Sequence, residues 1–263
     1  MNANPVASAS VCGTVMLVGA GPGDPELLTL KAVRAIRRAT VLLVDDLVGE
    51  GVLHYARRST RIVHVGKRGG CQSTPQAFIQ QLMLREAQSG ERVVRLKGGD
   101  PLVFGRGGEE AEYLRAHGVE VEVVNGITAG LAAATALQIP LTHREHAHGV
   151  ILVTGHAKQG GARLHWPTLA AAAAQGLTLV IYMSVTTAAE VQSGLLRTMP
   201  ASTPVAVVQH ASLPQQRHAI GVLGELVTLI AQHRLGSPAI ILIGDVLTGL
   251  QQLTATDAQM HAA

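Results

Sequence analysis

Short apolar runs alternate with longer stretches of mixed polarity along the whole chain. In the first half, five runs of strand length are each followed by a segment long enough for a helix: 15–18, 41–44, 62–65, 93–96 and 119–124. Such alternation predicts an α/β unit, and strands without polar alternation predict a buried sheet that is rich in parallel pairings. The first half is therefore expected to fold as one α/β domain.

The same rhythm begins again in the second half. Five further runs predict strands at 150–154, 177–183, 205–208, 219–223 and 239–243. Helices are predicted at 131–141, 169–174 and 187–196, and the second of these is an alanine run with high helix propensity. We expect two α/β domains, at 14–138 and 147–250, with a boundary near 138–147 and disordered tails at 1–13 and 254–263.

The composition narrows the classes of partner. The 263 residues are 47% hydrophobic and 15% charged, which fits globular domains and excludes an intrinsically disordered chain. There are 29 glycines but only 2% aromatic residues, so Ala, Val, Leu and Ile must form the core. With few stacking surfaces and a net charge of only +3, no nucleic-acid partner is expected, whereas a small anionic ligand fits the basic excess.

Cysteine usage and hydropathy indicate a reduced, cytoplasmic protein. The two cysteines, Cys12 and Cys71, cannot make a disulfide framework, and nothing near either of them resembles a paired set of metal ligands. No segment approaches the roughly 18 uninterrupted apolar residues of a membrane span, so no membrane association is expected. Three histidines lie within 143–148, but only Glu145 joins them there, and we expect no metal site.

A glycine-rich turn, GAGPGDP, follows the first predicted strand and leads into a helix expected to begin at Pro25 or Glu26. The layout is similar to a dinucleotide-binding turn, with Asp45 at the end of the next strand. However, Pro22 and Pro25 each remove a backbone donor, and Asp24 adds negative charge where a pyrophosphate would bind. A nicotinamide-dependent oxidoreductase is therefore an alternative that the turn itself disfavours.

A second loop, RLKGGDPLVFGRGGEE, follows the fourth predicted strand and is rich in glycine, which lets the backbone approach a ligand closely. Asp100 suits ribose hydroxyls or an ammonium group, and Arg106 suits a carboxylate held through two N–H groups. The loop thus suggests two ligands of different charge. The alternative without a ligand is a helix N-terminus at which Arg106 pairs with Glu109 and Glu110.

Six ordered segments resemble the tetrapyrrole methylase family: GAGPGDPELLTLKA, VGKRGG, RLKGGDPLVFGRGGEE, NGITAG, IPLTHR and SPAIILIGDV. They extend over nearly the whole chain, and the RLKGGDP and FGRGGEE blocks are similar to the branch that acts on uroporphyrinogen III. The resemblance implies a two-domain α/β tetrapyrrole methylase fold with a cofactor cleft between the domains, and a homodimer. The chain departs from the family pattern in three places: Asp46 stands in place of Arg, Asn125 stands in place of Pro, and VVQHAS stands where the family commonly has an acidic-Asn-Gly-Thr pattern.

The activity implied by the resemblance is C-methylation with S-adenosyl-L-methionine as methyl donor and S-adenosyl-L-homocysteine as product. Two successive methylations would convert uroporphyrinogen III to precorrin-2, for sirohaem or cobalamin biosynthesis. A methylase of a later precorrin is the nearest alternative, although RLKGGDP and FGRGGEE should then have degenerated and have not. Besides this methylase and the oxidoreductase considered above, a third alternative is a protein that sequesters the tetrapyrrole without catalysis.

The resemblance also implies the site residues. Cofactor contacts map onto ten positions: Pro22, Gly98, Gly99, Asp100, Val103, Thr128, Ala129, Met183, Ala211 and Ala239. The catalytic positions map onto Asp45, Lys67, Arg106 and Glu109, and the tetrapyrrole contacts map onto Arg106, Glu109, Arg144 and Met183.

The chemistry restricts what these residues must do. A pyrrole carbon attacks the sulfonium methyl group directly, so the protein needs no nucleophile but must align the reactants and later accept a proton. An arginine stays protonated in ordinary surroundings, which assigns Arg106 first to substrate carboxylates. The proton acceptor is left among Asp45, Glu109 and a propionate of the substrate.

Overall fold

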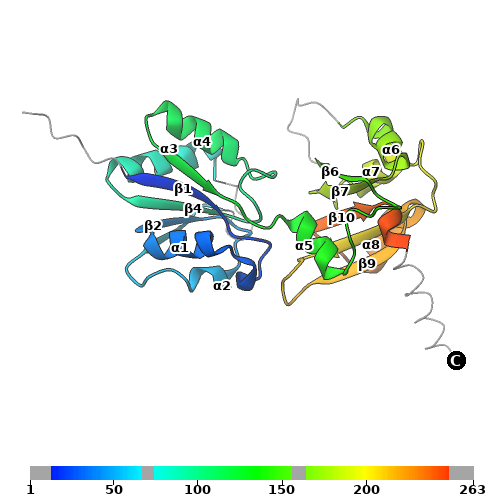
Figure 1. The fold of residues 1–263 in the computed structure, drawn as a ribbon, viewed down its shortest axis with the longest axis horizontal. Helices are drawn as coiled ribbons and strands as arrows, with labels where there is room; N and C mark the ends of the chain where they lie inside the picture. The colour runs from blue at the N-terminus through cyan, green and yellow to red at the C-terminus, as the bar shows by residue number, and fades with distance from the viewer. Residues whose placement is uncertain (1–12, 67–73, 156–163, 249–263) are drawn as a thin grey trace, which may run out of the picture. The chain divides into compact units, whose positions relative to one another are not determined.

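A computed structural model describes residues 13–66, 74–155 and 164–248. The chain divides after Thr128 into two compact units, Met1–Thr128 and Ala129–Ala263. Each unit contains one five-stranded sheet with helices packed against it (Figure 1). The predicted α/β class and two-unit organisation are confirmed, and each of the ten predicted apolar runs forms a strand.

The first unit is built on a parallel sheet. Its strands are β1 (Thr14–Gly19), β2 (Val41–Val44), β3 (Arg61–His64), β4 (Arg92–Lys97) and β5 (Val121–Val124). Its helices are α1 (Leu30–Arg38), α2 (Glu50–Leu53), α3 (Gln76–Gln88) and α4 (Gly107–Ala116), with a 3-10 turn η1 (Pro25–Leu27). The strands lie in the order β3-β2-β4-β1-β5 and every pairing is parallel, as the apolar runs predict.

The sheet of the first unit is buried on both faces. Leu17 and Val93 belong to the core beneath α3 and α4, whereas Leu42 and Leu96 belong to the core beneath α1. In Figure 1, α3 and α4 lie on one side of the sheet and α1 and α2 on the other. Burial on both faces explains why the strand sequences are continuously apolar rather than alternating.

The first helix begins later than expected. Residues Pro25–Leu27 form only a 3-10 turn, and Leu28 is extended. Thr29 then caps α1, because its hydroxyl oxygen accepts a hydrogen bond from the backbone N–H of Ala32 at 3.1 Å. The prediction that the α-helix begins at Pro25 or Glu26 is therefore wrong, since a second capping residue restarts the helix at Leu30.

The second unit has a mixed sheet. Its strands are β6 (Gly149–Thr154), β7 (Leu177–Tyr182), β8 (Pro204–Gln209), β9 (Arg217–Val222) and β10 (Ala239–Ile243), in the order β6-β7-β10-β8-β9. Its helices are α5 (Ala129–Ala136), α6 (Trp166–Ala174), α7 (Ala188–Leu195) and α8 (Leu226–Gln232), with 3-10 turns η2 (Leu223–Glu225) and η3 (Asp245–Leu247).

Parallel pairing in the second sheet is restricted to β6 with β7. The pairs β7–β10, β10–β8 and β8–β9 are antiparallel, so the two units share the alternation of strands and helices but differ in the direction of their strands. The connection at 210–216 explains part of the difference, because a parallel crossover needs about a dozen residues or more.

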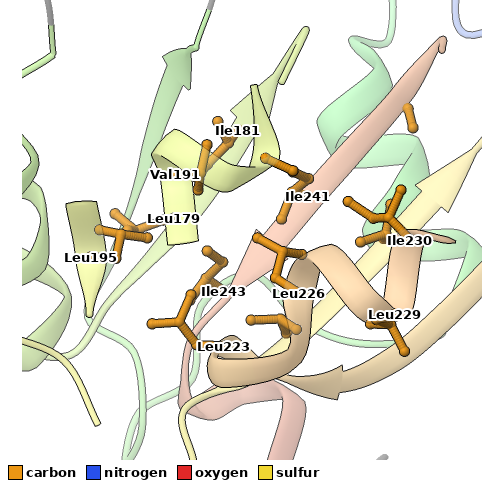
Figure 2. Packing of buried hydrophobic residues seen from close by; sticks show 14 of the residues in the cluster. Leu179, Ile181, Val191, Leu195, Leu223, Leu226, Leu229, Ile230, Ile241 and Ile243 are labelled. Atoms are coloured by element: carbon orange, nitrogen blue, oxygen red, sulfur yellow. The ribbon is translucent and has the colours of Figure 1, made fainter. Parts of the chain in front are cut away.

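Helices α6, α7 and α8 pack on one face of the second sheet. Figure 2 shows Leu179 and Ile241 of the strands packed with Val191 of α7 and Leu226 and Ile230 of α8, all of them in one hydrophobic core. Helix α5 packs on the other face, where Gly130 lies against Val180 of β7. The contacts therefore place α5 in the second unit. The boundary between the units follows Thr128, earlier in the chain than the boundary expected near 138–147.

The described helices are all too short or too polar to cross a membrane. The expected tails fall largely in 1–12 and 249–263, which lie outside the described residues, as do Cys12 and Cys71.

Candidate functional site

The loops that follow β1 and β4 meet at the carboxyl edge of the first sheet. Gly21 and Gly99 exchange two backbone hydrogen bonds, with N···O distances of 3.2 and 2.7 Å. These strands are neighbours, and both loops leave from the carboxyl ends of their strands. Parallel α/β sheets bind their ligands beyond this edge. The two glycine-rich motifs therefore lie at the expected ligand position of this unit.

Close backbone contacts explain why glycine stands in these loops. A Cβ atom on Gly19 would lie 2.5 Å from the backbone nitrogen of Gly126 and 2.7 Å from the carbonyl oxygen of Gly99. Gly21 and Gly99 also adopt positive φ angles of 71° and 68°. Glycine is thus required here for the three loops after β1, β4 and β5 to pack together.

Asp100 connects two of these loops. It is 6% exposed, and its Oδ2 accepts hydrogen bonds from the backbone N–H of Gly126 at 3.1 Å and from the side chain of Asn125 at 3.4 Å. Its Oδ1 accepts from the backbone N–H of Leu102 at 2.8 Å. The departure from the family pattern at Asn125 therefore adds a donor to this carboxylate, and the observed contacts of Asp100 hold the loops together.

Asp45 stands at the carboxyl end of β2, and its side chain is 35% exposed. Its Oδ2 accepts a hydrogen bond from Nη2 of Arg95 at 3.1 Å, and its Oδ1 accepts from the backbone N–H of Asp46 at 3.3 Å. Both oxygens are thus oriented by the protein while the carboxylate remains open to solvent. A carboxylate held in this way is suited to accept a proton from a bound molecule.

Arg106 and Glu109 form a paired site at the start of α4. Nε and Nη2 of Arg106 donate to the two carboxylate oxygens of Glu109 at 3.1 and 2.6 Å, and both side chains are more than half exposed. The hydrogen bonds from Arg106 to Glu109 raise the pKa of Arg106. Arg106 therefore remains a cation suited to an anionic ligand, and its helix-terminal pairing matches the alternative considered from the sequence.

The remaining predicted residues of the first unit lie on the same edge. Pro22 follows β1, Gly98 and Val103 belong to the loop after β4, and Thr128 follows β5. Lys67, the other predicted acid/base residue, lies outside the described residues.

In the second unit, three predicted cofactor residues come together at one end of the sheet. Met183 follows β7 directly, Ala239 begins β10, and the antiparallel register pairs Ile240 with Tyr182. Ala211 comes two residues after β8, in a segment joined to the start of β10 by a hydrogen bond from His210 N to the carbonyl oxygen of Pro238 at 3.1 Å. Met183 is 49% exposed, which leaves an apolar side chain available to a ligand.

Tyr182 links this edge to α5, and the sequence reasoning missed it. Its hydroxyl oxygen accepts a hydrogen bond from the backbone N–H of Gly130 at 2.9 Å. Gly130 follows Ala129, and Tyr182 precedes Met183, so one bond holds two predicted cofactor segments side by side. The signal in the sequence is a rare tyrosine at the end of an apolar strand, because a buried phenol group usually has a hydrogen-bond partner.

We expect Tyr182→Phe to lower stability by about 1 kcal/mol, because the Gly130 N–H loses its partner. Thermal unfolding followed by circular dichroism measures this as a decrease of a few degrees. Tyr113→Phe is the matched control, since the Tyr113 hydroxyl makes no hydrogen bond with any described residue. Equal melting temperatures for both variants would show that the Tyr182 hydroxyl does not fix α5.

Three buried charges beneath Asp45 were also missed. Arg95 and Lys97 on β4 are at most 3% exposed, and each contacts Glu110 on α4, whose side chain is fully buried. Their signal is the strand sequence RVVRLK, in which two cations occupy alternate positions of an otherwise apolar strand. Alternate positions face the same side of a sheet, so both cations must share a buried anion.

Arg144 lies exposed in the turn between α5 and β6, beside a histidine cluster. Donor atoms of His143, Glu145 and His146 lie within 4.8 Å of one another, and all three side chains are exposed. The imidazole rings of His143 and His146 are stacked, with centroids 4.6 Å apart and planes at 15°. Lone pairs of stacked rings lie in nearly parallel planes, which is a poor geometry for two ligands of one ion. The expectation that no metal binds here stays a prediction.

Comparisons with known proteins agree on one family. The model of the Tetrapyrrole (Corrin/Porphyrin) Methylases matches residues 14–227. A uroporphyrinogen-III C-methyltransferase of Pseudomonas aeruginosa is 57% identical over 89% of this chain and 94% of its own length. A siroheme synthase of Actinobacillus pleuropneumoniae is 50% identical over 90% of this chain, which spans only 48% of that protein.

A solved structure of a tetrapyrrole methyltransferase is also similar to this chain. The uroporphyrin-III C-methyl transferase of Thermus thermophilus, complexed with S-adenyl homocysteine, has a TM-score of 0.76 and 43% identity, over 90% of this chain and 99% of that chain.

Proposed function

Because the chain belongs to the tetrapyrrole methylase family, we propose that it transfers two methyl groups from S-adenosyl-L-methionine to uroporphyrinogen III and so forms precorrin-2. The observation that carries this proposal is the 57% identity with the Pseudomonas aeruginosa methyltransferase over nearly the full length of both proteins. The match to the family model, over residues 14–227, includes the motifs that form the carboxyl edge of the first sheet. The product would enter sirohaem or cobalamin biosynthesis.

The proposed cofactor contacts, which the family resemblance supplies, are of kinds that suit an adenosyl group. In the first unit they are Pro22, Gly98, Gly99, Asp100, Val103 and Thr128, and in the second they are Ala129, Met183, Ala211 and Ala239. Most of these side chains are small, and glycines in the first loops allow close approach of backbone N–H and C=O groups. Met183 adds an adaptable apolar surface. When bound, S-adenosyl-L-methionine supplies an electrophilic methyl group on a positively charged sulfur.

Asp45 is the proposed proton acceptor. Arg95 and the Asp46 N–H orient its carboxylate, which stays 35% exposed. Glu109, by contrast, accepts hydrogen bonds from Arg106 through both of its oxygens. Asp45 therefore takes the proton that leaves the tetrapyrrole after methylation, because its carboxylate is held in a fixed orientation and is open to a ligand.

Arg106 and Arg144 are the proposed partners of the substrate carboxylates. A guanidinium group can hold a carboxylate through two parallel N–H···O bonds, and Arg106 already makes this geometry with Glu109. A substrate carboxylate would compete with Glu109 for the Nε and Nη2 donors of Arg106. Until the substrate binds, Glu109 occupies these donors and keeps the Arg106 side chain in place. Lys67 is retained as the second acid/base residue on the resemblance alone.

We also propose that the protein is a cytoplasmic homodimer that acts on a small-molecule tetrapyrrole. The dimer is supported by the family resemblance. Sedimentation equilibrium tests it: twice the chain mass of 27.4 kDa is the expected result, and a monomer at micromolar concentration would exclude it.

A thermal-shift titration tests the class of cofactor. S-adenosyl-L-homocysteine should stabilise the protein by about 2.7 kcal/mol at 100 times its dissociation constant, because only the folded state binds it. NADH serves as the matched control for the oxidoreductase alternative and should leave the melting temperature unchanged. Stabilisation by NADH without any effect of S-adenosyl-L-homocysteine would overturn the proposed function.

A further inference from the structure

Four charged side chains form a connected network from the interior of the first unit to its carboxyl edge. Glu110 of α4 has a fully buried side chain, and Arg95 and Lys97 of β4 are 2% and 3% exposed. Asp45, at the outer end of the network, is 35% exposed. Only Asp45 among these groups is therefore open to a ligand, and the other three can act on a reaction only through it.

Glu110 is the centre of this network. Its Oε1 accepts hydrogen bonds from Nε of Arg95 at 3.3 Å, from Nζ of Lys97 at 3.2 Å and from the side chain of Gln76 at 2.9 Å. Its Oε2 is buried and has no hydrogen-bond partner among the described residues. Burial and the nearby charge of Arg95 lower the pKa of Lys97, while Glu110 acts in the opposite direction. Glu110 is thus the anion that allows two cations to be buried side by side.

Arg95 is fixed on three sides of its guanidinium group. Nε donates to Glu110, Nη1 donates to the carbonyl oxygen of Leu96 at 3.3 Å, and Nη2 donates to Oδ2 of Asp45 at 3.1 Å. Because the guanidinium group is planar and rigid, anchoring Nε and Nη1 determines where Nη2 points. The orientation of the Asp45 carboxylate therefore depends on Glu110, although the two carboxylates share no direct hydrogen bond.

From this geometry we infer that Glu110 is a positioning residue for Asp45, acting through Arg95. The inference rests on the proposed function, in which Asp45 accepts the proton. Without the Glu110 carboxylate, Nε of Arg95 loses its charged partner, and the guanidinium group shifts toward Asp45 or away from it. Either movement displaces the Asp45 oxygens from the direction in which they meet the substrate, and small misalignments of a reacting group lower the rate strongly.

The test is the isosteric variant Glu110→Gln, with Glu112→Gln on the exposed side of the same helix as control. We expect Glu110→Gln to lower kcat by about 10- to 100-fold, as for other residues that orient a reacting group indirectly. The dissociation constant of S-adenosyl-L-homocysteine should change by less than about twofold, because the network does not include the proposed cofactor contacts. Glu112→Gln should keep the wild-type kcat.

A double-mutant cycle separates positioning from a purely structural role. In an Asp45→Asn background, Glu110→Gln should cause no further loss of kcat, because its effect passes through Asp45. The same fold-loss in both backgrounds would overturn the inference, and so would a wild-type kcat for Glu110→Gln alone.

A second variant keeps the inference testable if Glu110→Gln does not fold. Arg95→Lys retains the positive charge but removes the fork that joins Glu110 to Asp45, so kcat should again fall while cofactor affinity is kept. An unchanged kcat would reject the inference. Failure of the proposed function is distinguishable from all of these outcomes, because the wild-type protein would then form no methylated product.

Discussion

Asp45→Asn is expected to lower kcat by about 10²- to 10⁴-fold, the usual contribution of a positioned general base. The substitution keeps the shape of the side chain and removes its ability to accept a proton as a carboxylate. Affinity for S-adenosyl-L-homocysteine should be retained, because the backbone loops that are proposed to bind it do not depend on the Asp45 charge. Steady-state kinetics under anaerobic conditions, together with calorimetric titration of S-adenosyl-L-homocysteine, measure both quantities.

Glu50→Gln is the matched control for Asp45→Asn. Glu50 is an exposed acid in the first turn of α2, five residues along the chain, and should show wild-type kinetics. If Asp45→Asn turned over at the wild-type rate, the proton would be accepted by Glu109 or by a substrate propionate, and the role assigned to Asp45 would be wrong.

Gly19→Ala is expected to have the largest effect on stability. The added methyl group would lie 2.5 to 2.7 Å from backbone atoms of Gly126 and Gly99, and backbone atoms cannot rotate away as a side chain can. Overpacking of this kind destabilises by about 1–3 kcal/mol or more. Since the loops after β1, β4 and β5 must separate to accommodate it, S-adenosyl-L-homocysteine should also bind at least about tenfold more weakly, equivalent to 1.4 kcal/mol. Urea unfolding and calorimetry measure the two effects.

Gly108→Ala provides the control for Gly19→Ala. A Cβ atom at Gly108 would meet no other atom within 4 Å, and the residue lies in α4. Alanine favours helix over glycine, so stability should rise by up to about 1 kcal/mol. If both glycine substitutions had the same effect, close packing of the three loops would not be what restricts position 19.

The sequence predicts the strands well because their burial is nearly complete. β2 and β10 are buried at every residue, and their apolar runs stand out from the polar segments around them. Strand direction is not encoded in the same way. β8 and β10 pair antiparallel although their sequences read like the parallel strands of the first unit, since burial on both faces gives the same pattern in either direction.

Only part of the candidate site can be predicted from the sequence. Glycine loops and Asp45 are recognisable because they occupy contiguous motifs at strand ends. The contact of Tyr182 with Gly130, and that of Arg95 with Glu110, join residues from separate elements, and a single sequence does not show which elements pack together. The late start of α1 has a local cause: Asp24 caps only the 3-10 turn, Leu28 is extended, and Thr29 then caps the helix that begins at Leu30.

The most direct test of the proposed function is the mass of the product. Purified protein should be incubated anaerobically with uroporphyrinogen III and S-adenosyl-L-methionine, and the tetrapyrrole then analysed by mass spectrometry. A product heavier by two methyl groups, formed through a singly methylated species, is the predicted result. Unchanged uroporphyrinogen III in the presence of active S-adenosyl-L-methionine would contradict it.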